Sequence, residues 1–417
     1  MKSWKKLTKY IAGGLAACAF ALNPITADAA PGDGTAESAQ AESAKYATGS
    51  YNLLTDHSKE AFLKKYDIVT KGKDTKIILD TDIRHMNDDT YALIALLRAD
   101  EMELIDLLGV TAAGANALTA NVTYTTLATL DLLGRGDVPV YQGTDAPLRG
   151  FMSKEKLRKM VGYMPYVGAY QFMDRYTTDY TKAVENGLTM TNFPAPTSRP
   201  KAQRASDYII EQVHKYPGKV TIVALAGLTN IAEALKKDPT IARDAAGIIY
   251  MGGVFDVHGE KLTSVEINFW YDPDAAVISL NGGWKKQTIV PHDAAVKCIK
   301  GMDVMERFNR SNVNKYTDLV ARETLLPLAT EKYDPTNPIF CWDPITVAAL
   351  LCPSLITEQR MRDVAVCNQE GIAWGSSFAY EPGEGPETSA PAMVVSSVDR
   401  NKFWDFLVDL YAVEPQK

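Results

Sequence analysis

Apolar positions along this chain follow two patterns that alternate from residue 76 onward. Near-continuous apolar runs at 76–79, 220–225 and 247–251 are typical of strands that are buried on both faces of a parallel sheet. Between such runs lie stretches in which apolar residues recur every three or four positions, which is the spacing of an amphipathic helix. These stretches predict helices over 88–99, 118–133, 205–215 and 230–237.

The alternation of strands and helices predicts the fold class. We expect an α/β domain with a doubly wound, mostly parallel, Rossmann-like sheet, helices on both faces and right-handed crossovers. Ligands in such folds bind beyond the carboxyl ends of the strands. One more helix is expected at about 51–66, and the segment 154–200, with its tyrosines and prolines, is expected to be an insertion between strands.

The N-terminal part of the chain has the features of a targeting signal. A basic start with four lysines precedes an apolar stretch at 10–22 that is too short to span a bilayer. An A-x-A cleavage site follows at 27–29. We therefore predict a signal peptide at 1–29, a linker and N-terminal extension at 30–75, and one globular domain at 76–413, with no transmembrane segment in the mature chain.

This signal predicts an exported protein, either secreted or periplasmic. The sequence Leu-Ala-Ala-Cys at 15–18 also resembles a lipoprotein cleavage box, which would make Cys18 a lipid anchor. The apolar stretch at 19–22 would be an unusual start for a tethered linker, so free secretion is favoured. Export permits disulfides. Without a metal-type CxxC spacing, however, buried thiols are the favoured interpretation of the four remaining cysteines: Cys298, Cys341, Cys352 and Cys367.

The charge of the chain argues against a nucleic-acid-binding protein. The net charge is −7, and removal of the signal peptide takes away four lysines and one aspartate. The mature chain is therefore more acidic still and supplies no basic face to follow phosphates. A hydrophobic content of 46% is ordinary for a globular protein with a sizeable core.

Four aspartates crowd into the sequence DTDIRHMNDD at 80–89, directly after the first predicted strand. Carboxylates this close repel one another, and at least one pKa rises unless a cation neutralises them. Because these acids fall at the carboxyl end of a strand, a bound cation is favoured over acids that merely face water. Asp88, at the start of a predicted helix, also suits a helix N-cap.

Five sequence motifs resemble those of nucleoside hydrolases and occur in the order of that family. They are ILDTD…DDTYALIALL, GVTAAGAN, VALAGLTNIAEAL, YMGGVF followed by EINFWYDPDAA, and CWDPITVAALL. Each motif alone is a weak signal, but five in this order are specific. Over about 76–413 the chain is therefore identified as a member of the family, with the fold of its inosine- and uridine-preferring type.

The resemblance implies a Ca²⁺ site. Asp82, Asp89 and Asp343 would bind the ion, and the carbonyl of Thr229 would complete the protein ligands. Oxygen atoms are the ligands that Ca²⁺ prefers, and such an ion can activate a water for attack on the anomeric carbon. Asp82 would touch both the ion and the water, so it is the expected general base.

The resemblance also implies a set of residues that hold the ribose. Amide and carboxylate groups can bind vicinal hydroxyls, and the candidates are Asp88, Asn116, Glu260, Glu266 and Asn268. Glu260 stands where the family often has an asparagine that meets the 5′-hydroxyl. A carboxylate can accept a hydrogen bond there but cannot donate one, so this contact would differ.

Two further departures from the family pattern concern the loop and the base. Five residues, 83–87, separate DTD from DD where the common form has three, and Arg84 replaces the usual glycine. Trp342 replaces a histidine that protonates the departing base in many members. Indole cannot do this, but it can stack on a purine, and a purine-preferring branch carries tryptophan there. Packing of Trp342 in the core is the alternative.

No histidine is favoured as a replacement for the acid that protonates the departing base. His85 and His258 lie in predicted loops near the motifs, where a histidine is usually solvated, and His292 is expected to be structural.

We therefore expect calcium-dependent hydrolysis of the N-glycosidic bond of ribonucleosides, with a purine preference, to give ribose and the free base. One alternative is an exported nucleoside- or ribosyl-binding protein of the same fold with little or no hydrolase activity. Another is a hydrolase of a different N-riboside. The expected partner is a small-molecule nucleoside, and a homo-oligomer, common in the family, is left open by the sequence.

Overall fold

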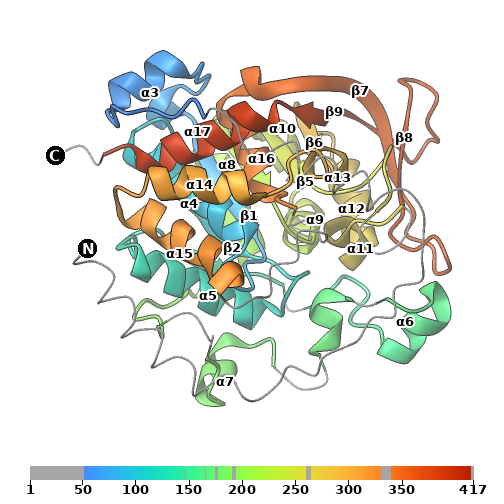
Figure 1. The fold of residues 1–417 in the computed structure, drawn as a ribbon. Helices are drawn as coiled ribbons and strands as arrows, with labels where there is room; N and C mark the ends of the chain where they lie inside the picture. Colours follow the sequence, from blue (N-terminus) through green and yellow to red (C-terminus); the bar gives the residue numbers. More distant parts are fainter. Residues whose placement is uncertain are drawn as a thin grey trace.

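A nine-stranded sheet forms the centre of the protein (Figure 1). The structure is a computed structural model that describes residues 51–414, apart from 145, 165, 174–176, 190–193, 260–263 and 330–339. The strand order is β3-β2-β1-β4-β5-β6-β9-β7-β8. The strands are β1 (Lys76–Thr81), β2 (Asp106–Ala112), β3 (Val140–Gln142), β4 (Val220–Ala224), β5 (Gly247–Met251), β6 (Gln287–Val290), β7 (Ile356–Val366), β8 (Ser377–Tyr380) and β9 (Ala390–Val398).

The sheet is parallel from β3 through to β9, and β7 runs antiparallel to both β9 and β8. In the sheet, β2 and β3 follow β1 on one side, and β4 lies on the other side of β1. This reversal next to β1 opens a crevice at the carboxyl ends of β1 and β4, where open α/β sheets bind ligands. The predicted fold class, a doubly wound and mostly parallel sheet, is confirmed.

Two apolar cores lie on opposite faces of the sheet, because successive side chains of a strand point to opposite sides. In β1, Ile77 and Leu79 belong to one core and Ile78 to the other. The larger core packs against α3 (Lys59–Lys65), α4 (Asp88–Glu101), α5 (Thr119–Leu132), α13 (His292–Ala295), α14 (Met302–Arg310), α15 (Lys315–Ala329), α16 (Asp343–Leu351) and α17 (Arg400–Ala412).

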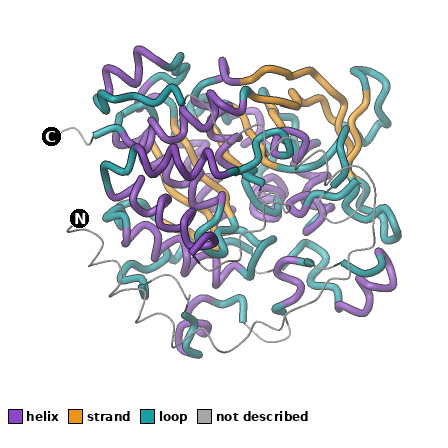
Figure 2. The backbone as a smooth tube through the Cα atoms, in the orientation of Figure 1, coloured by secondary structure: helices purple, strands orange, loops and turns teal. Residues whose placement is uncertain are grey.

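The second core is covered by a smaller set of helices. These are α8 (Ala205–Lys215), α9 (Thr229–Lys237), α10 (Thr240–Asp244) and α12 (Pro273–Leu280). Figure 2 shows the strands between helices, and the short helix α11 (Ile267–Tyr271) lies directly before α12. The described residues also contain three short 3₁₀ turns: η1 (Gly72–Asp74), η2 (Gly168–Gln171) and η3 (Pro353–Leu355).

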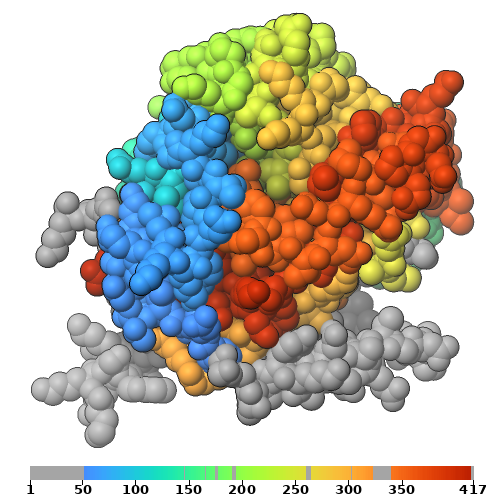
Figure 3. All heavy atoms as spheres, turned by 90° about the horizontal axis from the view of Figure 1, so that it is seen from above, coloured from blue at the N-terminus to red at the C-terminus, as the bar shows by residue number. Residues whose placement is uncertain are grey.

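The first helix is shorter than the sequence predicts. Ser58 caps α3, since its side chain accepts a hydrogen bond from the N–H of Ala61. The prediction of a helix from residue 51 is wrong for 51–58, because this segment binds α17 instead. The N–H groups of Asn52 and Leu54 donate to carboxylates of α17, those of Asp405 and Asp409 respectively. Figure 3 shows this blue segment beside the red C-terminal part of the chain.

The segment between β3 and α8 is the expected insertion. It contains α6 (Lys154–Val161), η2 and α7 (Tyr180–Glu185), and Figure 1 shows α6 and α7 apart from the sheet, below it. Its first part has a small apolar core of its own, in which Met164 and Tyr170 pack with Trp270 and Tyr271 of α11. The insertion is thereby attached to the loops at the carboxyl end of the sheet.

The N-terminal predictions concern residues that the structure does not describe. The signal peptide, the lipidation candidate Cys18 and most of the predicted linker lie in 1–50, outside the described residues. Within the described residues, no helix is both long and apolar enough to span a bilayer. The four described cysteines are free, and three of them are buried.

Candidate metal and substrate site

The candidate site lies where β1 and β4 end and where α4 and α16 begin. Asp82 follows β1, and Thr229 is the first residue of α9, which follows β4. These two strands pair directly, so the loops that follow them meet at one edge of the sheet. Asp88 and Asp343 are the first residues of α4 and α16, two helices that pack against each other in the larger core.

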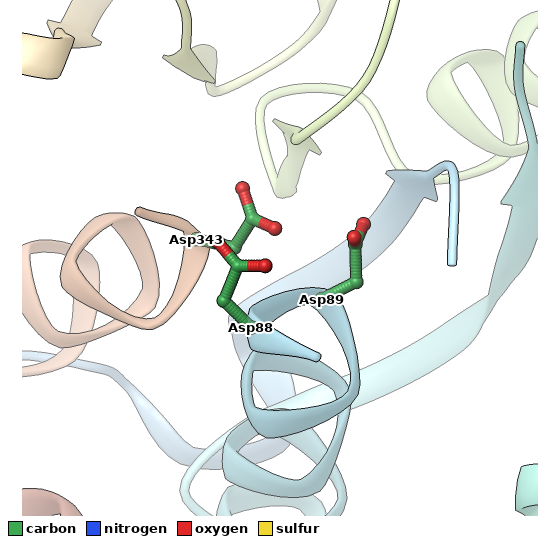
Figure 4. A group of neighbouring side chains, drawn as sticks. All are labelled: Asp88, Asp89 and Asp343. Atoms are coloured by element: carbon green, nitrogen blue, oxygen red, sulfur yellow. The ribbon is translucent and has the colours of Figure 1, made fainter. Parts of the chain in front are cut away.

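Three carboxylates converge in this crevice, those of Asp88, Asp89 and Asp343. Each offers an oxygen, and the three oxygens lie within 4.8 Å of one another. Figure 4 shows all three side chains facing a common space, two from α4 and one from α16. Asp89 and Asp343 are buried, whereas Asp88 is partly exposed. The free N–H groups at the helix starts supply some positive potential to these acids.

Burial and mutual repulsion raise the pKa values of this cluster. The pKa of Asp89 rises to about 7, first because the carboxyl is buried and then because Asp88 is negatively charged. The pKa of Asp343 is raised well above its usual value by burial and by the charges of Asp89 and Asp88. Without a positive charge among them, these groups resist being ionised together.

The acids therefore fit a metal ion. The cluster consists of carboxylate oxygens, which are the ligands of hard divalent cations, and contains neither sulfur nor imidazole ligands among the described residues. A cation would remove the electrostatic penalty that raises the pKa values of Asp89 and Asp343. The geometry is thus compatible with a metal centre built on two helix N-termini.

Asp82 lies next to this cluster rather than within it. Its N–H donates to Oδ1 of Asp89 at 3.3 Å. Its carboxylate accepts two hydrogen bonds from Asn116, one from the backbone N–H at 2.6 Å and one from Nδ2 at 3.0 Å. Burial and the charge of Asp89 raise the pKa of Asp82. The roles of Asp82 as ligand and general base stay predictions, and Asp88 joins the carboxylates that the sequence assigned to the metal.

Thr229 is buried at the start of α9, and its hydroxyl donates to Oδ2 of Asp272 at 2.8 Å. The next residue, Asn230, joins the start of α9 to the end of β1 and to the loop after β3. Its Nδ2 donates to Oδ1 of Asp80 at 2.8 Å, and its Oδ1 accepts from the N–H of Thr144 at 2.9 Å. Sequence reasoning missed Asn230, although it lies inside the LTN motif, because the motif assigns no role to it.

The predicted ribose residues are ordered by backbone hydrogen bonds. Glu266 is the N-cap of α11, and its carboxylate accepts from the N–H groups of Asn268 at 2.7 Å and Gly253 at 2.8 Å. Nδ2 of Asn268 donates to the carbonyls of Leu225 and Met251, each at 3.2 Å. The buried Oδ1 of Asn268 has no hydrogen-bond partner among the described residues and is available as an acceptor. Glu260 lies outside the described residues.

Trp342 belongs to an aromatic group beside the acids. Its indole Nε1 donates to Nδ1 of His292 at 2.8 Å, and the two rings are 22° from parallel with centroids 5.9 Å apart. Phe340 packs edge-on against both rings. Because Nδ1 of His292 accepts the indole proton, a neutral imidazole carries its own proton on Nε2. No sequence pattern indicates that these two residues meet, since they are 50 residues apart in the chain.

Comparison with known proteins identifies relatives of this chain. The family model described as inosine-uridine preferring nucleoside hydrolase matches residues 77–405. A curated relative, probable uridine nucleosidase 2 of Arabidopsis thaliana, is 28% identical over 320 residues, which are 74% of this chain and 87% of that protein.

Two solved structures have the same fold. A plant nucleoside hydrolase superposes with a TM-score of 0.64 at 27% identity and covers 82% of this chain and 99% of its own. A purine-preferring ribonucleoside hydrolase from Gardnerella vaginalis superposes with a TM-score of 0.61 at 24% identity, over 81% of this chain and 98% of its own.

Proposed function

The chain belongs to the inosine-uridine preferring nucleoside hydrolase family, and from this premise we propose that it hydrolyses ribonucleosides to ribose and free base with the help of one Ca²⁺ ion. Hydrolysis of a nucleoside N-glycosidic bond is the reaction of the family. The identity of the metal, the role of each residue and the preferred base are specific to the proposal.

The observation that carries the proposal is the group of Asp88, Asp89 and Asp343, with carboxylate oxygens within 4.8 Å of one another. When bound, Ca²⁺ would supply positive charge to these acids and lower the pKa of a neighbouring water. Asp82, whose backbone N–H bonds to Asp89, is adjacent to such an ion.

Asp82 is proposed as the general base. It takes one proton from the water, whose oxygen then bonds to the anomeric carbon as the bond to the base nitrogen breaks. The base leaves with the bonding electron pair and takes up one proton from solvent, which gives the neutral free base. The two hydrogen bonds from Asn116 favour the ionised carboxylate, which is the form that a base needs. Water attacks directly, so inversion at the anomeric carbon is expected.

The ribose is proposed to lie between the acids and α11. Asp88 and Asn116 bind it from one side, and Glu266 and Asn268 from the other. The unpartnered Oδ1 of Asn268 supports this, because a buried acceptor without a donor is costly and a ribose hydroxyl would satisfy it. Glu266 acts chiefly by holding the start of α11, since its carboxylate already accepts backbone N–H groups.

Two observations bear on the preferred base, and they point in different directions. Trp342 favours purines, because its ring lies beside the acids and can stack on a base. The name of the relative from Arabidopsis thaliana favours uridine instead. We retain purine nucleosides as the proposal and uridine as the alternative.

The decisive experiment is a substrate panel with and without a calcium chelator. Purified protein is incubated with inosine, adenosine, guanosine, uridine and cytidine, and released ribose is measured. We expect release that stops with chelator and returns with Ca²⁺. If no nucleoside yields ribose in millimolar Ca²⁺, the hydrolase proposal is lost. Tight inosine binding without release would then support the alternative of a nucleoside-binding protein, for which the replacements at Arg84, Glu260 and Trp342 are the motivation.

The cellular location is a separate proposal. The N-terminal 29 residues support export, secreted or periplasmic, with lipidation at Cys18 as the alternative. The N-terminal sequence of the mature protein, read from the culture medium and from membranes, would distinguish the two.

A further inference from the structure

The insertion between β3 and β4 reaches the candidate site through Tyr166. The Tyr166 hydroxyl lies 3.0 Å from the carbonyl oxygen of Asn116 and 3.0 Å from its Oδ1, and its single proton is shared between these two acceptors. The other end of the Asn116 side chain donates to Asp82. A hydrogen-bonded path therefore runs from the insertion to the carboxylate that follows β1.

Arg84, which stands where the family has a glycine, extends this path. Its Nη1 donates to the Tyr166 hydroxyl at 3.3 Å. Its guanidinium also lies over the rings of Tyr166, at 5.8 Å from the centroid, and Phe172, at 5.1 Å. A phenol has one proton to donate and can accept at the same oxygen. The hydrogen bonds therefore all run one way: Arg84 donates to Tyr166, Tyr166 donates to Asn116, and Asn116 donates to Asp82.

The position of Tyr166 is fixed by the backbone next to it. The N–H of Ala169 donates to the carbonyl of Ala115 at 2.7 Å. Gly168 has a φ of +54°, and a Cβ there would lie 2.0 Å from the same carbonyl, so this close approach requires glycine. The buried Tyr170 donates to the carbonyl of Tyr271 at 3.1 Å. The turn that carries Tyr166 is therefore held against the end of β2 and against α11.

The Tyr166 contact favours the same orientation of the Asn116 amide as the Asp82 carboxylate does. With Oδ1 accepting from the phenol, Nδ2 faces the Asp82 carboxylate and donates to it. In the flipped orientation, Oδ1 would face a carboxylate and Nδ2 would face the phenol, which loses the hydrogen bond to Asp82. The second hydrogen of Nδ2 remains for a ribose hydroxyl.

We propose that Tyr166 is a positioning residue that orients the Asn116 amide for ribose binding, and that Arg84 holds Tyr166 in place. This inference rests on the proposed function, in which Asn116 binds the ribose. It gives the insertion a defined part in the site, and it explains how the loop can function with arginine in place of glycine.

The test compares Tyr166→Phe with Tyr163→Phe. Both changes remove one hydroxyl from the same segment, and Tyr163 is 67% exposed, so it is the matched control. The readouts are kcat and KM for the best substrate of the panel, and the affinity for ribose by calorimetry. We expect Tyr166→Phe to lower kcat/KM and ribose affinity by about tenfold, the upper range for one neutral hydrogen bond. Tyr163→Phe should match the wild type in all of these readouts. The Ca²⁺ affinity of both variants should stay within about threefold of the wild-type value.

A second comparison separates positioning from a general structural effect. If Tyr166 acts through Asn116, Tyr166→Phe in an Asn116→Ala background should change ribose affinity no further. Arg84→Ala should weaken ribose binding less than Tyr166→Phe, and the double variant should equal Tyr166→Phe alone. The melting temperatures of all variants identify any loss of folding. If Tyr166→Phe is unstable, the ribose affinity of Arg84→Ala tests the proposal instead, because Arg84 is partly exposed and its replacement should preserve the fold.

The inference is overturned if Tyr166→Phe behaves like Tyr163→Phe, or if its effect adds fully to that of Asn116→Ala. These outcomes are distinct from failure of the proposed function, which would appear as a wild-type protein that releases no ribose from any nucleoside. In that case the ribose-binding arm still decides the role of Tyr166.

Discussion

The backbone N–H of Trp342 donates to Oδ2 of Asp88 at 3.1 Å, and this bond joins the starts of two helices that are 254 residues apart in the chain. Asp88 opens α4 and Trp342 immediately precedes α16, so the bond joins the two helix starts. Packing of α4 against α16 in the larger core brings the carboxylates of Asp89 and Asp343 together there. The acid cluster is therefore a consequence of helix packing, and it can be tested by altering its members one at a time.

Replacing Asp343 by asparagine should abolish calcium binding. The change removes one of three negative charges that would hold the ion and leaves only a neutral amide oxygen at 343, and kcat/KM should fall by at least about a hundredfold, since even residues that only orient metal ligands cost ten- to hundredfold. Calcium should no longer raise the melting temperature. The control is Asp318→Asn, an exposed aspartate paired with Arg322. A variant at 343 that calcium stabilises as well as the wild type would contradict the assignment.

The stability of the calcium-free protein should fall as the pH rises from about 4 to about 7, the range between the ordinary and the raised pKa of Asp89. The pKa of Asp89 is raised to about 7 in the folded protein, above its ordinary value of 3.8. Between these two values the folded state holds a proton that the unfolded state has lost, so its stability decreases with rising pH. Added calcium should offset this loss. Melting temperatures with calcium and with chelator should therefore diverge as the pH rises, and a constant difference would argue against the linkage.

Replacing Trp342 should affect purine nucleosides more than uridine. Stacking on an aromatic ring contributes about 1–3 kcal/mol per base, so Trp342→Ala should raise the KM for inosine by roughly tenfold. Trp342→Phe keeps an aromatic face but loses the hydrogen bond to His292, and it should retain most of the affinity. Steady-state kinetics on both nucleosides would measure this. Equal changes for inosine and uridine would mean that Trp342 packs the site without contacting the base.

Asn230→Ala should destabilise the protein and weaken calcium binding together. The Asn230 amide bonds the buried Asp80 and the N–H of Thr144, and loss of partners for buried polar groups costs about 1–3 kcal/mol. Since Asn230 follows Thr229, the start of α9 should shift as well. Asn281→Ala, at an exposed helix end, is the control. Urea unfolding and calcium titration of both variants would check this. Unchanged calcium affinity in Asn230→Ala would argue against Thr229 as a metal ligand.

Much of the fold could be predicted because local periodicity encodes it. The strand at 247–251 and the helix at 205–215 have the predicted bounds, since their apolar spacing suits only one kind of element in each case. The order of the motifs also placed Asp82, Thr229 and Asp343 after strands or at helix starts on one edge of the sheet. The segment 51–58 was predicted incorrectly, because its backbone binds Asp405 and Asp409, and no local pattern signals such a long-range contact.

The sequence by itself determined the fold class, the family and the chemical types of the residues at the site. Only the tertiary structure decided which of them touch: Asp88 lies with Asp89 and Asp343, His292 meets Trp342, and Tyr166 meets Asn116. The reason is physical. Hydrophobic periodicity is a property of neighbouring residues, whereas the distance between two side chains on different elements depends on how helices, loops and insertion pack together.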